Sequence, residues 1–403
     1  MALPLFSTPL LPLKTNWRKT LFNLHLYAGL VVGLFLLTAS LTGLVLAFRP
    51  KFDPAYRADY FHLAPLPARL PIDQVVLAAR QVYPKAKLDY VEVDPNPASA
   101  DLVRMGDRDE VFVDPYRGTV LKVRNKEYAF FYMVEKLHRY LFLGKQGQWL
   151  TGTAAFALFV MIGTGVYLWW PRTAKSLSTA FRFDRSLQSR AWNVNLHKVV
   201  GIYSAVLLAV SAFTGGAELP NWVAKVYFAP ASSRGIGRAL QSSGPVGGPG
   251  SVSAETVWRS AQAAMGPFQS AMFSWPKGPR GPMQVEYVAE DAPHPNALSY
   301  VFLDGYTGAV LRRSPYAQEA ASSRFYLWLL PIHLGQIGGW AGWIAVVTGA
   351  LGAAFLTVTG FWLYYRRKLR PVRRSAPTGR SESAALPGSA AGARARPQPV
   401  VRS

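Results

Sequence analysis

The sequence predicts an α-helical membrane protein, with four transmembrane helices in a pseudo-duplicated bundle and two small α+β domains outside the membrane. Three observations lead to this class. The chain has 403 residues, of which 50% are hydrophobic. Four segments, residues 21–48, 148–170, 195–216 and 340–365, are apolar over about 20 residues or more, the length of a helix that crosses the ~30 Å core of a bilayer. The pattern of the first half also recurs in the second half.

The recurrence is clearest around four histidines and four Thr-Gly pairs. Spans one and three both open with Asn-Leu-His, and alignment on the histidines matches His25 with His197, Gly29 with Gly201, and Thr42-Gly43 with Thr214-Gly215. Before spans two and four, a histidine precedes a Thr-Gly pair by 26 residues, which matches His138 and Thr164 with His333 and Thr359. We expect the Thr-Gly pairs to serve helix packing.

Basic residues mark one side of the membrane. Residues 1–20 contain three Lys or Arg, the connection 171–191 contains five and the tail 366–403 contains ten, against only Asp184 and Glu382. These parts carry eighteen positive and two negative charges, +16 of the formal net charge of +22. Because such segments stay in the cytoplasm, we expect both termini inside and the two long loops outside. Topology and anionic lipid explain the basic excess, so no nucleic-acid partner is indicated.

Each outer loop has the pattern of one helix followed by a small antiparallel sheet. In the first loop a helix at Leu70–Tyr83 precedes strands at Leu88–Val93, Asp101–Met105 and Glu110–Val113. In the second, a helix at Ala254–Met265 precedes strands at Gln269–Ser274, Met283–Val288 and Ser299–Leu303. Both loops then contain an Asp-x-Tyr-x-Gly turn, at Asp114–Gly118 and Asp304–Gly308. We expect residues 229–250 to be a flexible linker and residues 375–403 to be disordered.

These features divide the chain into ten parts. They are the cytoplasmic N-terminus 1–20, span one at 21–48, the first outer domain at 50–137, a His-bearing segment with span two at 138–170, the cytoplasmic loop 171–191, span three at 192–216, an outer segment with the linker at 217–250, the second outer domain at 251–332, a His-bearing segment with span four at 333–365, and the basic tail 366–403.

The predicted topology sorts the four histidines into two pairs. His25 and His197 belong near the cytoplasmic face, and His138 and His333 near the outer face. Two imidazoles from facing helices supply the two axial ligands of a b-type haem, so we expect two such haems, one near each face. Gly29 and Gly201, one helical turn after their histidines, remove side chains where a porphyrin would lie.

Other metal sites fit the sequence less well than haem, and the two remaining histidines have no partner in the pattern. Zinc or copper also bind four histidines, but the two pairs lie at opposite faces and form no single site. The chain has no Cys, which excludes Cys-ligated clusters and covalently attached c-type haem. We expect the remaining histidines, His62 and His294, to be surface residues of the outer loops.

The sequence resembles the PepSY-associated transmembrane helix family, which consists of iron-regulated proteins of the bacterial inner membrane. The resemblance rests on the His-x-x-x-Gly openings of spans one and three, on Leu137–Leu141, on Gly163–Arg172 and on the two Asp-x-Tyr-x-Gly-x-Val-Leu turns, which are similar to the ends of PepSY domains. Family members studied as ferric-siderophore reductases bind haem in the transmembrane bundle. The resemblance implies PepSY-like periplasmic domains, the four paired histidines as ligands, and location in the bacterial inner membrane.

We therefore expect an oxidoreductase of the lipid bilayer that reduces ferric siderophores on the periplasmic side and releases iron as Fe(II). No strand-associated G-x-G-x-x-G or Walker A motif occurs, so membrane quinol or a separate cytoplasmic reductase must donate the electrons. One alternative is a membrane-anchored PepSY module that binds or regulates periplasmic peptidases without haem. A siderophore transporter is disfavoured because the span interiors offer mainly Thr, Ser and Gly rather than a charged pore.

Overall fold

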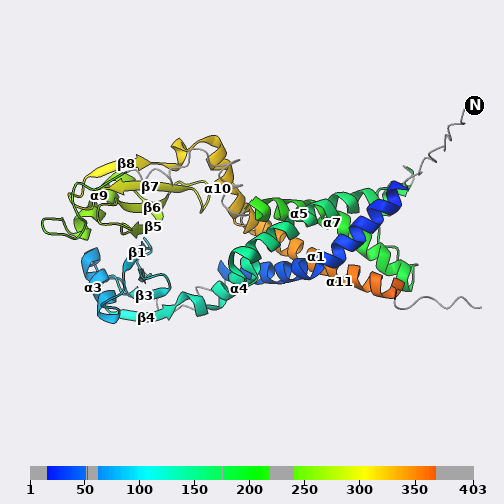
Figure 1. Ribbon diagram of the computed structural model, residues 1–403, viewed down its shortest axis with the longest axis horizontal. Helices are drawn as coiled ribbons and strands as arrows, with labels where there is room; N and C mark the ends of the chain where they lie inside the picture. The colour runs from blue at the N-terminus through cyan, green and yellow to red at the C-terminus, as the bar shows by residue number, and fades with distance from the viewer. Residues whose placement is uncertain are drawn as a thin grey trace, which may run out of the picture.

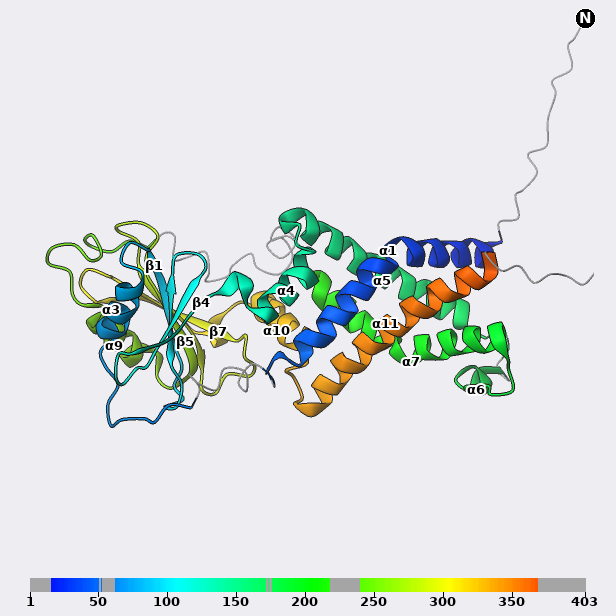
Figure 2. The same ribbon diagram turned by 90° about the horizontal axis from the view of Figure 1, so that it is seen from below.

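The computed structural model describes residues 16–50, 52, 62–171, 173, 176–217 and 240–368. A helical bundle forms one end of the molecule, and a β-sheet with two helices forms the other (Figure 1). The start of the first helix and the end of the last lie at the end of the bundle away from the sheet (Figure 2). The first 15 residues, the first half of the expected Gly-, Ser- and Pro-rich linker and nearly all of the basic tail lie outside the described residues.

Four of the described helices are long and apolar enough to cross a membrane. They are α1 (Trp17–Ala47), α5 (Gly144–Trp169), α7 (Ser189–Ala217) and α11 (Trp340–Lys368). Large apolar side chains such as Leu34, Phe156 and Val206 are exposed on them. Apolar side chains facing outward along a span suit a hydrocarbon solvent, because each helix satisfies its own backbone polar groups. Helix α1 packs against α5 and α11, and α7 packs against the same two helices.

The histidine-bearing segments before spans two and four are short helices of their own. Helix α4 (Phe130–Tyr140) precedes α5, and α10 (Ala321–His333) precedes α11. Leu141 and Phe142 end α4 with positive φ angles of 49° and 58°, and Gly335 turns the other corner with φ 67°. At these corners the helices approach closely: a Cβ at Gly147 would overlap the Tyr140 carbonyl, and one at Gly342 would overlap that of Ile337.

The sheet differs from the two separate small sheets that the sequence suggested. Its strands are β1 (Leu88–Val93), β2 (Asp101–Met105), β3 (Asp109–Val113), β4 (Val120–Asn125), β5 (Phe268–Ser274), β6 (Met283–Ala289), β7 (Leu298–Leu303) and β8 (Val310–Ser314). All eight form one antiparallel sheet in the order β4-β3-β2-β1-β5-β6-β7-β8. The two loops join where β1 pairs with β5, with Val91 opposite Phe273. Two separate four-stranded sheets would have four edge strands, and this pairing leaves two, β4 and β8.

One hydrophobic core lies between the sheet and the helices α3 (Ile72–Val82) and α9 (Ala254–Met265). The N-termini of these two helices cap each other. The Asp73 carboxylate accepts hydrogen bonds from the backbone N–H groups of Ala254 and Glu255, and the Glu255 carboxylate accepts one from the N–H of Ile72. Each carboxylate thus satisfies N–H groups that have no partner within their own helix. The two loops are therefore joined by helix caps as well as by strand pairing.

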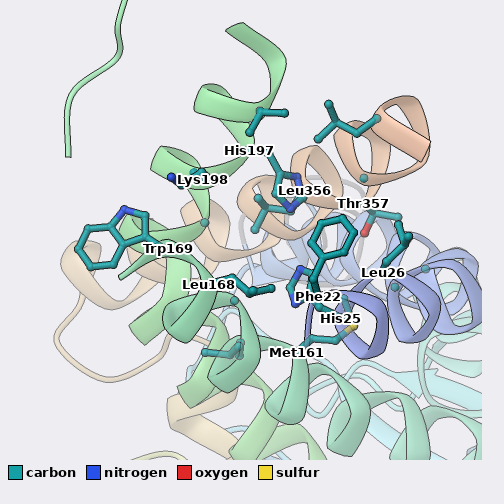
Figure 3. Close-up of a pocket in the computed structure, with 18 of the residues that line it drawn as sticks. Phe22, His25, Leu26, Met161, Leu168, Trp169, His197, Lys198, Leu356 and Thr357 are labelled. Carbon is teal, nitrogen blue, oxygen red and sulfur yellow. The ribbon is translucent and has the colours of Figure 1, made fainter. Parts of the chain in front are cut away.

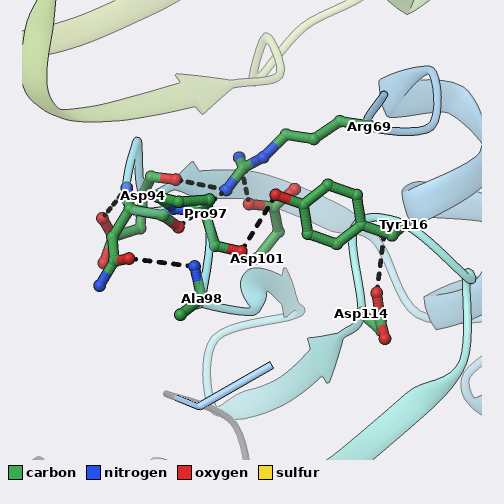
Figure 4. Close-up of polar contacts among 8 residues, drawn as sticks. Arg69, Asp94, Pro97, Ala98, Asp101, Asp114 and Tyr116 are labelled. Atoms are coloured by element: carbon green, nitrogen blue, oxygen red, sulfur yellow. Dashed lines mark hydrogen bonds and ion pairs between the residues drawn. The ribbon is translucent and has the colours of Figure 1, made fainter. Parts of the chain in front are cut away.

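The two Asp-x-Tyr-x-Gly turns have a structural role. Asp114 accepts hydrogen bonds from the N–H groups of Tyr116 and Arg117, and Gly118 follows with a φ of 69°, which suits glycine. The Tyr116 hydroxyl donates to the Pro97 carbonyl and so fixes the neighbouring loop (Figure 4). The second turn repeats this arrangement: Asp304 accepts from Tyr306 and Thr307, Tyr306 donates to Pro249, and Gly308 has a φ of 79°.

Three further helical segments are short. Helix α6 (Leu177–Ala180) lies in the connection between α5 and α7, and single turns of 3-10 helix at Lys126–Tyr128 and Tyr316–Gln318 lead from the sheet into α4 and α10. Helices α4 and α10 therefore lie between the sheet and the bundle (Figure 1). Among the described elements, these two histidine-bearing helices connect the sheet to the spans α5 and α11.

Candidate functional site: two histidine pairs in the helical bundle

The bundle brings together His25 of α1 and His197 of α7. Their ring centres lie 6.4 Å apart with the ring planes nearly perpendicular, at 88°. Both histidines lie near the end of the bundle where the described chain begins and ends. Figure 3 shows the two rings projecting into the same space, with Phe22 beside His25. This arrangement forms the first of two histidine pairs, which we call the inner pair.

The second pair joins His138 of α4 and His333 of α10, and we call it the outer pair. The ring centres lie 6.3 Å apart, with 49° between the ring planes. Because α4 and α10 connect the sheet to the bundle, this pair lies at the sheet end. The grouping of the histidines in the structure is the one that the sequence predicted from the topology.

The ring separation matches two imidazoles that share one metal ion. With a metal–nitrogen bond of about 2 Å on each side and the ring centre roughly 1 Å beyond each nitrogen, the ring centres of two opposed ligands lie about 6 Å apart. Rings in direct offset or edge-to-face contact have centres about 4.5–7 Å apart, a range that also includes both pairs. The separations are therefore compatible with a shared metal ion and also with direct contact of the two rings.

Each of the four histidines contacts a threonine of another helix through Nδ1. The Nδ1 to Oγ1 distances are 3.0 Å for His25 and Thr164, 2.8 Å for His197 and Thr359, 2.9 Å for His138 and Thr42, and 2.9 Å for His333 and Thr214. These threonines belong to the four Thr-Gly pairs that were expected to serve helix packing. The structure adds a contact that this expectation did not include, because each of them also bonds a histidine of a pair. The recurrence of His and Thr at matched positions in the two halves was the available signal.

A cavity of about 410 Å³ surrounds the inner pair. It is lined mainly by apolar side chains of α1, α5, α7 and α11, and its walls include the small residues Gly29, Gly33, Gly201 and Ala205. A Cβ at Gly33 would lie 2.7 Å from the Phe361 ring, whereas a Cβ at Gly201 would meet only Leu356, at 3.7 Å. Gly33 therefore permits close helix packing, as does Gly29, where a Cβ would lie 3.2 Å from Met161 Cε, and Gly201 keeps the cavity wide beside His197.

Four cationic side chains complete the lining of this cavity. They were not predicted from the sequence as part of the site. They are Arg18, Arg190, Lys198 and Arg367. No Asp or Glu belongs to the lining among the described residues. Arg18 donates to the Leu168 carbonyl at 2.9 Å, and the Arg367 guanidinium lies 5.1 Å from the centre of the Phe22 ring. An apolar cavity with a cationic lining suits a ligand that has a large apolar body and negatively charged groups.

The other two histidines differ from each other. His62 is exposed, as expected. The expectation for His294 is wrong, because its side chain is 3% exposed, its Nε2 lies 3.1 Å from the Tyr316 hydroxyl and its ring lies 4.5 Å from that of Trp328 in α10. It helps to hold the sheet against α10. Among the described residues no group of three or more His, Cys, Asp or Glu is close enough to hold a metal ion.

Among curated proteins, none matches the chain closely enough to count as a relative. A family model does match it. The model describes the PepSY-associated TM region and covers residues 22–367, a range that contains both histidine pairs, all four spans and the sheet. The chain therefore belongs to the PepSY-associated transmembrane family.

Proposed function

We propose that this protein is a membrane electron-transfer protein that binds two b-type haems, one at each histidine pair, and reduces ferric siderophores to release Fe(II). The observation that carries the proposal is the pairing of four histidines at ring separations of 6.4 Å and 6.3 Å within one helical bundle. The family resemblance supports a ferric siderophore as the electron acceptor, and the residues of the two pairs support haem as the cofactor.

The residues at the inner pair fit a haem in three independent ways. Two neutral imidazoles are the usual donors for a six-coordinate haem iron. The apolar walls and the glycines beside the rings suit a flat macrocycle, and the cations Arg18, Arg190, Lys198 and Arg367 suit its two carboxylates. A haem held by His25 and His197 would supply one-electron transfer.

The protein's own residues have three tasks in this proposal. The four imidazoles would hold the two haems. The apolar lining around His25 and His197 keeps water out, which helps to set the reduction potential. The cations compensate negative charge that would be costly to bury unpaired. At the outer pair, helices α4 and α10 place His138 and His333 next to the sheet, so the sheet is the part of the protein nearest to an outer acceptor.

The positions of the two pairs suit transfer across the membrane. His25 of the inner pair and Thr42, which bonds His138 of the outer pair, lie on one helix, 17 residues apart. At 1.5 Å per residue this separates the two pairs by about 25 Å along α1, close to the thickness of the hydrocarbon core. In the topology expected from the basic segments, the inner pair faces a quinol or cytoplasmic reductase and the outer pair faces the periplasm. One electron from that donor then reduces one Fe(III) to Fe(II).

A visible spectrum of the detergent-purified protein tests this function. We expect sharp bands of bis-histidine haem after reduction and two haems per chain. Addition of a ferric siderophore to the reduced protein, with an Fe(II) chelator present, should reoxidise the haem and give one chelated Fe(II) per electron. Protein that binds no haem after expression with sufficient haem supply would reject the proposal and favour the peptidase-binding PepSY module.

A further inference from the structure

We propose that four of the six Thr-Gly pairs in the spans are positioning devices for the haem ligands: each of the four threonines fixes the tautomer of one histidine, and Gly43, Gly165 and Gly215 make room for a ring. This inference rests on the proposed function. It concerns Thr42-Gly43, Thr164-Gly165, Thr214-Gly215 and Thr359-Gly360. Four occurrences, each joining two different helices, carry the argument.

The first step is to locate the threonine protons. A hydroxyl has one proton to donate and two lone pairs to accept. Each Oγ1 lies within hydrogen-bond distance of the carbonyl four residues earlier in its own helix, at 3.0 Å for Thr164 and Val160, 2.6 Å for Thr42 and Thr38, 2.8 Å for Thr359 and Phe355, and 2.7 Å for Thr214 and Val210. A carbonyl can only accept, so the threonine proton is donated to it. The oxygen then remains an acceptor for the histidine.

The second step follows for the imidazoles. Since Oγ1 accepts, the histidine Nδ1 must carry the proton and donate it. In a neutral imidazole the other nitrogen, Nε2, then has a free lone pair and can bind iron. In the opposite tautomer Nδ1 is an acceptor, and it would compete with the helix carbonyl for the single proton of the threonine hydroxyl. A hydrogen bond from Nδ1–H also increases the electron donation of the ring to the metal.

The third step concerns the glycines that follow the threonines. A Cβ would lie 2.9 Å from His333 Cε1 at Gly215, 3.2 Å from His138 Cε1 at Gly43, 3.2 Å from His25 Cε1 at Gly165 and 3.8 Å from His197 Cε1 at Gly360. The imidazoles therefore lie against the backbone of the helix that holds them. A methyl group at Gly215 would push the ring away, whereas at Gly360 it would make ordinary contact.

These contacts between threonines and histidines explain why each of the four spans contains a Thr-Gly pair that meets a histidine. Helices α1 and α7 each carry a histidine of the inner pair at one end and a threonine for the outer pair at the other. Helices α5 and α11 carry the threonines of the inner pair, and α4 and α10 carry the outer histidines. Each ligand is thus held by a helix other than its own, and the spacing of the helices sets the orientation of the rings.

The test uses Thr164→Val, which keeps the shape of the side chain and removes the acceptor. We expect a rise in the midpoint potential of the inner haem, because the ring donates less to Fe(III), and a roughly 10- to 100-fold loss of haem affinity at that pair. Thr164→Ser should restore the wild-type potential. Thr153→Val is the matched control, because Thr153 on the same helix bonds only the carbonyl of Trp149. The outer haem serves as an internal check that the protein is folded.

A second comparison tests the glycines. Gly215→Ala should shift the electron paramagnetic resonance signal of the outer haem, which reports ring orientation, and Gly360→Ala should leave the inner signal near its wild-type position. Either of two results would overturn the inference, given a wild-type protein that binds two haems. They are a wild-type potential and affinity in Thr164→Val, and equal spectral shifts in Gly215→Ala and Gly360→Ala. Wild-type protein without haem would instead reject the proposed function.

Discussion

The imidazole rings of His25 and His197 lie 6.4 Å apart, although the two residues open spans in different halves of the chain. In the proposed function each ring supplies one of the two ligands of a haem, so loss of either histidine should remove that haem. His25→Ala and His197→Ala should each eliminate one haem per chain, and the double variant should lose no more than either single one. Pigment analysis of the three purified proteins measures this. A double variant without any haem would show that the pairing is wrong.

The cationic lining of the inner cavity gives a second prediction. Arg190→Gln combined with Lys198→Gln removes two of the four positive charges. We expect weaker haem binding at the inner pair, by about 1.5–3 kcal/mol for each charged hydrogen bond lost, and normal binding at the outer pair. Haem titration of the apoprotein measures both sites. Arg259→Gln, on the sheet's helix α9, is the control, and equal losses in the two proteins would contradict the assignment.

The sheet contains a carboxyl group that makes stability depend on pH. Burial raises the pKa of Asp101 to about 7, and Arg69, whose guanidinium lies 3.3 Å from it, opposes this shift only in part (Figure 4). The folded protein therefore binds a proton that the unfolded chain, with an ordinary pKa of 3.8, has already released. Stability should fall as the pH rises from about 4 through 7.

Asp101→Asn removes this titration, so thermal unfolding of the variant should change less between pH 5 and pH 8 than that of the wild type. The pKa of Asp304 is shifted in the opposite direction. This carboxyl group is also subject to burial, but hydrogen bonds from Ser243 and from the N–H groups of Tyr306 and Thr307 lower its pKa to about 2. Its contribution is lost only as the pH falls from about 4 through 2. An unchanged slope in Asp101→Asn would show that another group dominates between pH 5 and 8.

The reciprocal caps of α3 and α9 predict coupled stabilities. Asp73→Ala and Glu255→Ala should each destabilise the protein by about 1 kcal/mol, in the range of other N-caps. Since the two carboxylates bond to adjoining N–H groups, the double variant should lose less than the sum of the two single losses. Urea unfolding followed by Trp fluorescence measures the three values, and strict additivity would mean that the caps act independently.

Topology can be tested directly. A reporter enzyme that works only in the cytoplasm should be active when fused after Arg374. A reporter that works only in the periplasm should be active when inserted at Gly244. This outcome would place the inner pair at the cytoplasmic face. The reverse outcome would exchange the donor and acceptor sides of the proposed function.

The sequence by itself determined the local elements and the two histidine pairs. An uninterrupted apolar run leaves few options besides a span, and alternation of apolar residues predicted β1 and β2 at their observed bounds. The pairing of His25 with His197 followed from topology, because spans that run in the same direction place equivalent residues at the same face.

Only the tertiary structure decided how distant segments meet. The pairing of Val91 with Phe273, which merges two sheets into one, has no local signature, since both strands have the same pattern whether or not they pair. The burial of His294 depends on Trp328 and Tyr316, which lie far along the chain. The contact of Thr164 with His25 depends on the rotation of α5 about its axis, which side-chain packing sets. Hydropathy fixes which segments enter a membrane, and packing fixes which of their faces touch.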